Sequence, residues 1–262
     1  MDSIGKSKER CAAPSMTEAA RTAPRAPGVL AGKVALITGG NRGIGKAIAL
    51  RLAQLGADVA ICGRDREALR AAAGELAAHG VRVHAQPADV TSSSEVEALV
   101  KASQAALGGI AILVNNAGMG LFGPLQEKSE QEWDSVMNTN LKSVFLVSRA
   151  VIPGMVQRKS GDIINISSLA GKNTFAGGAV YCASKWGLQG LSGCMAEDLR
   201  GYGIRVSAVC PGSVFTEFSG TGRKDPGKVL SADDVAHAVA MIATQGPRSF
   251  LSEVHLRPLS KT

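Results

Sequence analysis

The sequence predicts one doubly wound α/β domain, in which a parallel sheet of seven strands is covered by helices on both faces. Three observations support this prediction. Short apolar runs alternate with amphipathic stretches of helical length. A glycine-rich turn, TGGNRGIG (38–45), follows the first apolar run and opens the first amphipathic stretch. No linker-like segment interrupts the pattern up to residue 262. Alternation of this kind is typical of βαβ units, whose strands are buried on both faces.

Each predicted strand is a short apolar run, and most of these runs stop at glycine, proline or a polar residue, as buried parallel strands do. The predicted strands are 33–38, 58–62, 81–86, 110–115, 162–167, 204–210 and 253–257. The predicted helices carry apolar residues at helical spacing, and the third begins with a serine cap at Ser92 followed by Glu95. The predicted helices are 44–56, 65–78, 92–107, 130–153, 179–200 and 231–244.

Residues 1–30 lack this pattern, because they mix charges, small residues and three prolines with no apolar periodicity. We therefore expect a disordered tail that folding and turnover do not require, followed by one catalytic domain over 31–262. The tail also lacks the apolar core of a signal peptide.

Composition narrows the class of protein. The net charge is +7, but no run of lysine and arginine is long enough to predict binding to nucleic acid. No apolar run reaches membrane-spanning length, so no membrane partner is expected. The five cysteines form no CxxC pair, which favours a reduced, cytoplasmic setting. The four histidines show no metal-ligand spacing, so we expect no metal site.

The glycine-rich turn predicts a phosphate site. Gly39, Gly43 and Gly45 permit a tight turn between strand and helix and a close approach of the backbone to a pyrophosphate. The pyrophosphate would then lie at the amino end of the helix, where the helix dipole favours anions. A dinucleotide is the expected ligand.

The end of the second strand indicates which dinucleotide binds. An acidic residue there would favour NAD, but position 63 is glycine. Arg64 follows it and Arg42 lies in the glycine turn, and two guanidiniums suit the 2′-phosphate of NADP. The alternative is that Asp65 binds the ribose, since it stands 20 residues after Gly45. We favour NADP(H), because Asp65 is expected to lie beyond the strand, at the start of a helix.

The stretch VYCASKWG (180–187) contains a pair of side chains suited to acid–base catalysis. Tyr181 and Lys185 are four residues apart, so a helix places them on one face. A phenol has a pKa of about 10, and a neighbouring ammonium would lower it. Such a pair also arises by chance on solvated helix faces, and other motifs are needed to decide between the two interpretations.

Three further motifs follow predicted strands: NNAG (115–118), SSLAG (167–171) and CPG (210–212). Together with the glycine turn and Tyr181-x-x-x-Lys185, they resemble the short-chain dehydrogenase/reductase family over about residues 32–257. The resemblance implies that Tyr181 exchanges the proton and that Lys185 lowers the pKa of its phenol and binds the nicotinamide ribose. It also implies that Ser168 binds the substrate carbonyl oxygen, with Ser167 as the neighbouring alternative.

The resemblance extends to further residues. Asn140 matches the family asparagine that holds a relay water. Asn138, two residues earlier, is the alternative, a polar residue on the helix exterior. Asp89 and Val90 match an adenine-contacting pair, although Asp89 is equally explained as a loop cap. The complete set of cofactor residues that the resemblance and the turn imply is Gly39, Asn41, Arg42, Gly43, Ile44, Gly45, Arg64, Asp89, Val90, Asn116, Ala117, Gly118, Tyr181, Lys185, Pro211, Gly212, Val214 and Thr216.

The expected function is NADPH-dependent reduction of a small ketone to a secondary alcohol, most similar to the 3-oxoacyl reductases of the family. Carrier-protein substrates fit less well, because the chain ends SEVHLRPLSKT where many such reductases have Asp-Gly-Gly. The alternatives are an alcohol, steroid or sugar dehydrogenase of the same family and, from another class, a non-catalytic NADP-binding protein. The resemblance also implies a homodimer or homotetramer, with 130–153 and 179–200 as candidate interface helices.

Overall fold

Apolar strands and amphipathic helices alternate along the chain in the computed structural model, which describes residues 28–216, 218 and 225–260. The strands are β1 (Val34–Thr38), β2 (Asp58–Gly63), β3 (Val83–Pro87), β4 (Ile110–Asn115), β5 (Gly161–Ile166), β6 (Ile204–Pro211) and β7 (Glu253–Leu256). The α-helices are α1 (Gly43–Gln54), α2 (Arg66–Ala77), α3 (Ser93–Leu107), α4 (Glu130–Met137), α5 (Ser143–Arg158), α6 (Ala179–Leu199) and α7 (Ala232–Ala243). All seven predicted strands are therefore confirmed, with ends that differ by at most two residues.

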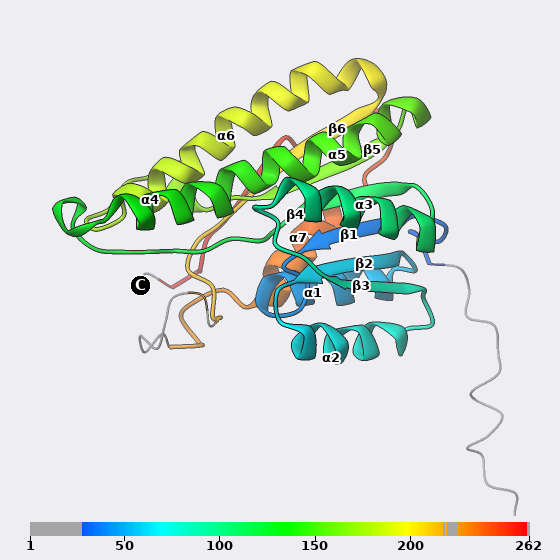
Figure 1. The fold of residues 1–262 in the computed structure, drawn as a ribbon, viewed down its shortest axis with the longest axis horizontal. Helices are drawn as coiled ribbons and strands as arrows, with labels where there is room; N and C mark the ends of the chain where they lie inside the picture. The colour runs from blue at the N-terminus through cyan, green and yellow to red at the C-terminus, as the bar shows by residue number, and fades with distance from the viewer. Residues whose placement is uncertain (1–27, 217, 219–224, 261–262) are drawn as a thin grey trace, which may run out of the picture.

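The strands form one parallel sheet in the order β3-β2-β1-β4-β5-β6-β7. Helices α1, α2 and α7 supply one apolar core, and α3, α5 and α6 supply the core on the opposite face (Figure 1). The predicted doubly wound sheet is thus confirmed. Strand order reverses between β1 and β4, so the crevice at the carboxyl ends of these strands is the expected place for a ligand.

The helix predicted over 130–153 is in fact two helices joined by a π-helical turn. α4 ends at Met137, the π turn (η3) spans Asn138–Lys142, and α5 continues to Arg158. The prediction was wrong here because apolar spacing runs through the whole stretch, and the one extra residue of a π turn leaves little trace in that spacing. Such turns are frequent at functional sites, and this one carries Asn140.

Pro153 lies inside α5 and does not end it, contrary to the sequence prediction. A proline removes the hydrogen bond to the carbonyl four residues earlier, here that of Arg149. Pro153 is on the exposed side of the helix, where water can satisfy that carbonyl. The helix therefore continues to Lys159, whose left-handed backbone ends it.

The folded chain begins before residue 31. The Leu30 amide donates to the Leu55 carbonyl at 2.9 Å, and its side chain is 1% exposed within the core beneath α1. Leu30, which the sequence analysis assigned to the tail, is therefore part of the core, and a single buried leucine carries no periodic signal. The rest of the predicted tail, residues 1–27, lies outside the described residues.

Within the described ranges, none of the helices combines the length and the apolar character that crossing a bilayer requires.

Replacing Leu30 should test how much its contact with α1 contributes. Leu30→Ala leaves a cavity under α1 and should lower the free energy of unfolding by about 2–5 kcal/mol. Val29→Ala is the matched control, since Val29 is 66% exposed, and its effect should stay small. Urea denaturation of both variants measures the difference. Equal effects would show that Leu30 makes no specific contribution to stability.

Candidate active site

A cleft of about 1420 Å³ lies at the carboxyl ends of the strands. Its walls come from the segments that follow each of the first six strands, from Gly39 after β1 to Thr216 after β6. Every predicted site residue lines it except Gly45 and Asn140. The lining residues from the predicted set are Gly39, Asn41, Arg42, Gly43, Ile44, Arg64, Asp89, Val90, Asn116, Ala117, Gly118, Ser168, Tyr181, Lys185, Pro211, Gly212, Val214 and Thr216.

Gly45 lies behind the cleft and lets three segments meet. A Cβ atom there would stand 2.2 Å from the Gly39 carbonyl oxygen and 2.4 Å from Asn116 Nδ2. The Asn116 side chain donates to the carbonyls of Thr38 and Gly39, at 3.0 and 3.3 Å. Because these contacts leave no room for a side chain at 45, the turn and the loop after β4 keep a fixed spacing.

Thr38 is a contributor that the sequence analysis missed. Its buried hydroxyl accepts from the backbone amides of Asn116 and Ala117, both at 3.0 Å. It thereby fixes the start of the loop after β4 to the end of β1. The only sequence signal was a polar residue at the end of an apolar strand, just before the glycine turn.

The end of the cleft that is predicted to bind the adenosine lies beyond β2. Asp65 caps α2, because its Oδ1 accepts from the backbone amides of Glu67 and Ala68, both at 3.0 Å. At Gly63 a Cβ atom would stand 2.5 Å from Asn41 Oδ1, so a side chain there would have to displace Asn41. The Asp65 carboxylate is thus engaged in its helix, while Arg64 is exposed beside the cleft.

Asp89 both lines the cleft and caps a turn. Its Oδ1 accepts from the Thr91 amide at 2.9 Å and from the Thr91 hydroxyl at 2.8 Å. The hydrogen bond from the Thr91 amide, assisted by its hydroxyl and by the charge of Arg64, holds the pKa of the Asp89 carboxyl below its usual value despite partial burial. The two sequence interpretations of Asp89 are therefore compatible.

Ser168, and not Ser167, is turned toward Tyr181. Ser168 precedes a short 3₁₀ turn (η4, Leu169–Gly171), and its hydroxyl accepts from the Ala170 amide at 3.1 Å and lies 3.5 Å from the Pro211 carbonyl. This hydroxyl is also close enough to the Tyr181 phenol to lower its pKa. The Ser167 hydroxyl is buried against Gly171, without a partner among the described groups. The geometry favours Ser168 as the hydroxyl that would meet a substrate oxygen.

Tyr181 and Lys185 lie on one face of α6, as their spacing predicts. Burial raises the pKa of the Tyr181 phenol to about 12, although the Ser168 hydrogen bond opposes this shift. Burial lowers the pKa of the Lys185 ammonium to about 8. The Lys185 Nζ atom is 5.8 Å from the centre of the Tyr181 ring and donates to the Ile166 carbonyl at 2.9 Å. The expected lowering of the phenol pKa by Lys185 is not seen: burial sets the direction of the shift, and the opposing contribution comes from Ser168.

Asn140 is buried and connects the loop after β4 to α6. Its Oδ1 accepts from the Met119 amide at 2.8 Å, and its Nδ2 donates to the Met119 carbonyl at 2.9 Å and to the Ser184 hydroxyl at 3.0 Å. The π turn directs this side chain inward. Asn138, expected on the helix exterior, instead lines the cleft together with Ser135 and Thr139.

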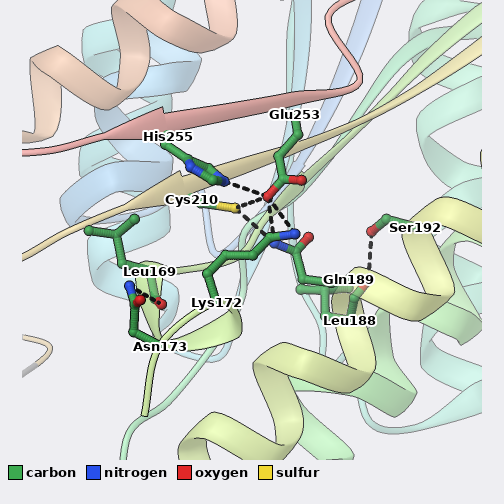
Figure 2. Close-up of polar contacts among 9 residues, drawn as sticks. All are labelled: Leu169, Lys172, Asn173, Leu188, Gln189, Ser192, Cys210, Glu253 and His255. Carbon is green, nitrogen blue, oxygen red and sulfur yellow. Dashed lines mark hydrogen bonds and ion pairs between the residues drawn. The ribbon is translucent and has the colours of Figure 1, made fainter. Parts of the chain in front are cut away.

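A polar cluster behind the cleft was also not predicted (Figure 2). Glu253 Oε1 accepts from Lys172 Nζ at 2.9 Å and from Gln189 Nε2 at 3.1 Å, and lies 2.6 Å from His255 Nε2. Cys210 Sγ is 3.5 Å from the same oxygen.

Three groups of metal-ligand type therefore lie together in this cluster, Cys210, Glu253 and His255, although their sequence spacing gave no sign of it. Burial raises the pKa of the Cys210 thiol to about 11. The cluster joins the segment after Ser168 and helix α6 to the last strand, because Lys172 and Gln189 both donate to the Glu253 carboxylate.

The comparisons with known proteins agree with this geometry. The family model for short chain dehydrogenase matches residues 33–227. An uncharacterized oxidoreductase of Staphylococcus aureus is 34% identical over 231 residues, which are 88% of this chain and 99% of that protein. A putative ketoacyl reductase of the granaticin polyketide synthase of Streptomyces violaceoruber is 43% identical over 203 residues, 77% of this chain and 75% of that protein. The crystal structure of a metagenomic short-chain oxidoreductase in complex with NADP is 46% identical, with a TM-score of 0.80, and covers 89% of this chain and 100% of its own.

The buried Lys185 predicts a specific pH dependence of stability. Its native pKa of about 8 lies below its ordinary value of about 10.4, so the unfolded state binds more protons between these two values. Below pH 8 the buried charge of Lys185 destabilises the folded state by its full amount. This destabilisation decreases as the pH rises toward 10.

Lys185→Met should therefore be more stable than the wild type at pH 7, by an amount on the order of 3 kcal/mol. The gap should shrink steadily between pH 8 and pH 10. Chemical denaturation across this range measures it, with the exposed lysine variant Lys101→Met as control. A gap that does not change with pH would show that Lys185 is not buried as a charge.

Proposed function

We propose that this chain, which belongs to the short-chain dehydrogenase family, reduces a ketone to a secondary alcohol with NADPH as the hydride donor. The observation that carries the proposal is the placement of Ser168, Tyr181 and Lys185 together in one cleft that also contains the glycine turn, with Lys185 Nζ 5.8 Å from the centre of the Tyr181 ring. The similarity to a putative ketoacyl reductase supports the class of substrate.

The residues present fit NADP(H). The turn at Gly39 and the amino end of α1 offer backbone amides to a pyrophosphate. Arg42 and Arg64 line the adenosine end, while Asp65 is engaged as a helix cap. Two guanidiniums, beside an Asp65 carboxylate whose Oδ1 caps α2, suit a 2′-phosphate. The NADP bound to the metagenomic relative supports the same choice.

In the proposed reaction, NADPH supplies a hydride to the carbonyl carbon. Ser168 donates a hydrogen bond to the carbonyl oxygen and stabilises its developing negative charge. Tyr181 transfers its hydroxyl proton to that oxygen, which yields the alcohol. Lys185, whose ammonium lies beside the phenol ring, stabilises the phenolate that remains until solvent reprotonates it. Asn140 holds the Met119 backbone against α6 and so keeps the cleft wall in position. A relay water at Asn140 would take part in reprotonation of the Tyr181 phenolate.

The pKa of Tyr181 bears on how reduction and oxidation would depend on pH. A phenol with a pKa of about 12 is protonated at neutral pH and is thus ready to donate. The reverse reaction, oxidation of an alcohol, would require the phenolate. The same site is expected to catalyse that reaction only at higher pH.

We further propose a homodimer or homotetramer built on the layer that contains α4, α5 and α6. Each of these helices exposes one large aromatic side chain: Trp133, Phe145 and Trp186, respectively. Exposed apolar surface of this kind is typical of interfaces. Light scattering of the purified chain measures the mass.

The cysteines of the described chain are free, which supports a reducing compartment such as the cytoplasm.

Tyr181→Phe tests the catalytic role. The change removes one hydroxyl, so the variant should fold normally, yet kcat for a reducible ketone should fall by about 10²–10⁴-fold. Tyr202→Phe is the matched control: it removes the only other tyrosine hydroxyl, on an exposed ring outside the cleft. Retention of more than about a tenth of the activity by Tyr181→Phe would remove this residue from the catalytic role.

Arg64→Ala tests cofactor choice. Charge-assisted hydrogen bonds to phosphate contribute roughly 1.5–3 kcal/mol each, so NADPH should bind about ten- to a hundredfold more weakly, while NADH binding should hardly change. The preference of the wild type for NADPH should also shrink as salt is raised. Arg66→Ala is the control, because Arg66 is exposed two residues away but does not line the cleft. Fluorescence titration gives the dissociation constants. Equal weakening of both cofactors would show that Arg64 does not bind the 2′-phosphate.

A further inference from the structure

Phenylalanine is scarce in this chain and concentrated at one place. Only 4% of residues are aromatic and six are phenylalanine, yet four of those six line the cleft, and three of the four form a cluster of rings with the candidate proton donor. Phe122 follows β4, Phe175 follows β5 and Phe218 follows β6. The ring centre of Phe122 is 5.4 Å from that of Tyr181 and 6.0 Å from that of Phe175, and Phe218 is 6.0 Å from Tyr181.

These three rings, which we call the phenylalanine triad, are open to the cleft. Phe122, Phe175 and Phe218 are 43%, 50% and 40% exposed, respectively, although large apolar rings are ordinarily buried. In the three contacting ring pairs, Phe122–Phe175, Phe122–Tyr181 and Tyr181–Phe218, the ring planes are inclined by 45–68°, so the rings meet at tilted or edge-on angles and are not stacked face to face. A guest with its own ring can make edge-to-face contacts with such a set, which a saturated chain cannot.

Two glycines make room for the triad. A Cβ atom on Gly120 would stand 2.8 Å from a Phe122 ring atom and 3.0 Å from one of Phe218. On Gly178 it would stand 2.6 Å from a Phe175 ring atom. The rings therefore occupy space that a side chain at either position would fill, so their positions follow from the packing of the surrounding backbone.

Among the described residues, Lys185 is the one charged side chain at this end of the cleft. Among the described lining residues the charged side chains are Lys185 and the four that belong to the adenosine end: Arg42, Arg64, Asp65 and Asp89. Beside the triad the lining is apolar or neutral, with Met119 and Leu169 among it. A neutral guest is therefore favoured over a phosphorylated one at this end.

From these observations we infer that the phenylalanine triad is a binding subsite for an aromatic ring, and that the substrates are ketones whose carbonyl is attached to, or close to, an aryl group. This inference rests on the proposed function for the reaction. The aryl ring would lie among Phe122, Phe175 and Phe218, with the carbonyl oxygen toward Ser168 and Tyr181. Ring-to-ring contacts would make the subsite prefer an aromatic ring over a saturated ring of similar size, beyond what burial of apolar surface contributes.

The test uses two matched pairs of probes. Benzamide and cyclohexanecarboxamide have the same amide and similar shapes, and neither is reducible here, so calorimetry in the presence of NADP⁺ reports binding without turnover. Acetophenone and cyclohexyl methyl ketone report KM and kcat. Wild type should bind benzamide at least about fivefold more tightly than its saturated counterpart, since two or three ring contacts add about two- to tenfold each.

Phe122→Leu, Phe175→Leu and Phe218→Leu keep an apolar side chain but remove the ring. Each variant should bind benzamide about two- to tenfold more weakly and raise KM for acetophenone by the same factor. The affinity for cyclohexanecarboxamide and the KM for cyclohexyl methyl ketone should change by less than twofold. Phe250→Leu, outside the cleft lining, is the control. Phe175 makes no ring contact with Tyr181, so its variant separates an effect on binding from an effect on the proton donor.

The outcomes separate the two proposals. The aromatic subsite is overturned if the wild type binds both amides with equal affinity. It is also overturned if the leucine variants weaken the aromatic and the saturated probe of a pair by the same factor, even if ketones are reduced. Absence of NADPH-dependent turnover with every ketone overturns the proposed reaction, while the amide affinities still decide on the subsite.

Discussion

The close approach at Gly45 is the constraint on which the site depends. With no Cβ at this position, helix α1 packs directly on the turn after β1, and Asn116 reaches across to the carbonyls of Thr38 and Gly39. The phosphate turn and the loop after β4 are therefore held as one unit. That loop continues to Met119, which Asn140 connects to the helix of Tyr181. Cofactor end and catalytic helix are thus related through a short chain of buried hydrogen bonds.

The two ends of the cleft obey different physical rules. At the end beyond β2 the lining is charged: Arg42 and Arg64 stand beside Asp65, whose Oδ1 caps α2. At the end that contains Tyr181, burial has the larger effect: it raises the pKa of the Tyr181 phenol to about 12 and lowers the pKa of Lys185 to about 8. Electrostatic preference at an exposed site depends on salt, whereas pKa shifts that come from burial are much less sensitive to it.

The sequence was sufficient to predict the sheet, the helical cover on both of its faces and most of the cleft lining. Parallel strands and the loops that follow them carry strong local patterns. It was insufficient where the cause is not periodic. The π turn at 138–142 keeps helical spacing, and Leu30 is buried by a contact with distant Leu55. The meeting of Cys210, Glu253 and His255 depends on the register of β6 with β7. The phenylalanine triad likewise comes from loops after three different strands.

The pairing of β7 has a practical consequence for anyone who handles this protein. The Gly212 amide donates to the Leu256 carbonyl at 2.8 Å, and Pro258 packs against Gly212, so the last strand supports the floor of the cleft. The described chain starts at the other end of the sheet, where Leu30 contacts Leu55, far from the carboxyl ends of the strands (Figure 1). Affinity tags, reporter fusions and surface anchors are therefore better placed at the amino terminus, since a bulky attachment after β7 would pull on a wall of the catalytic site.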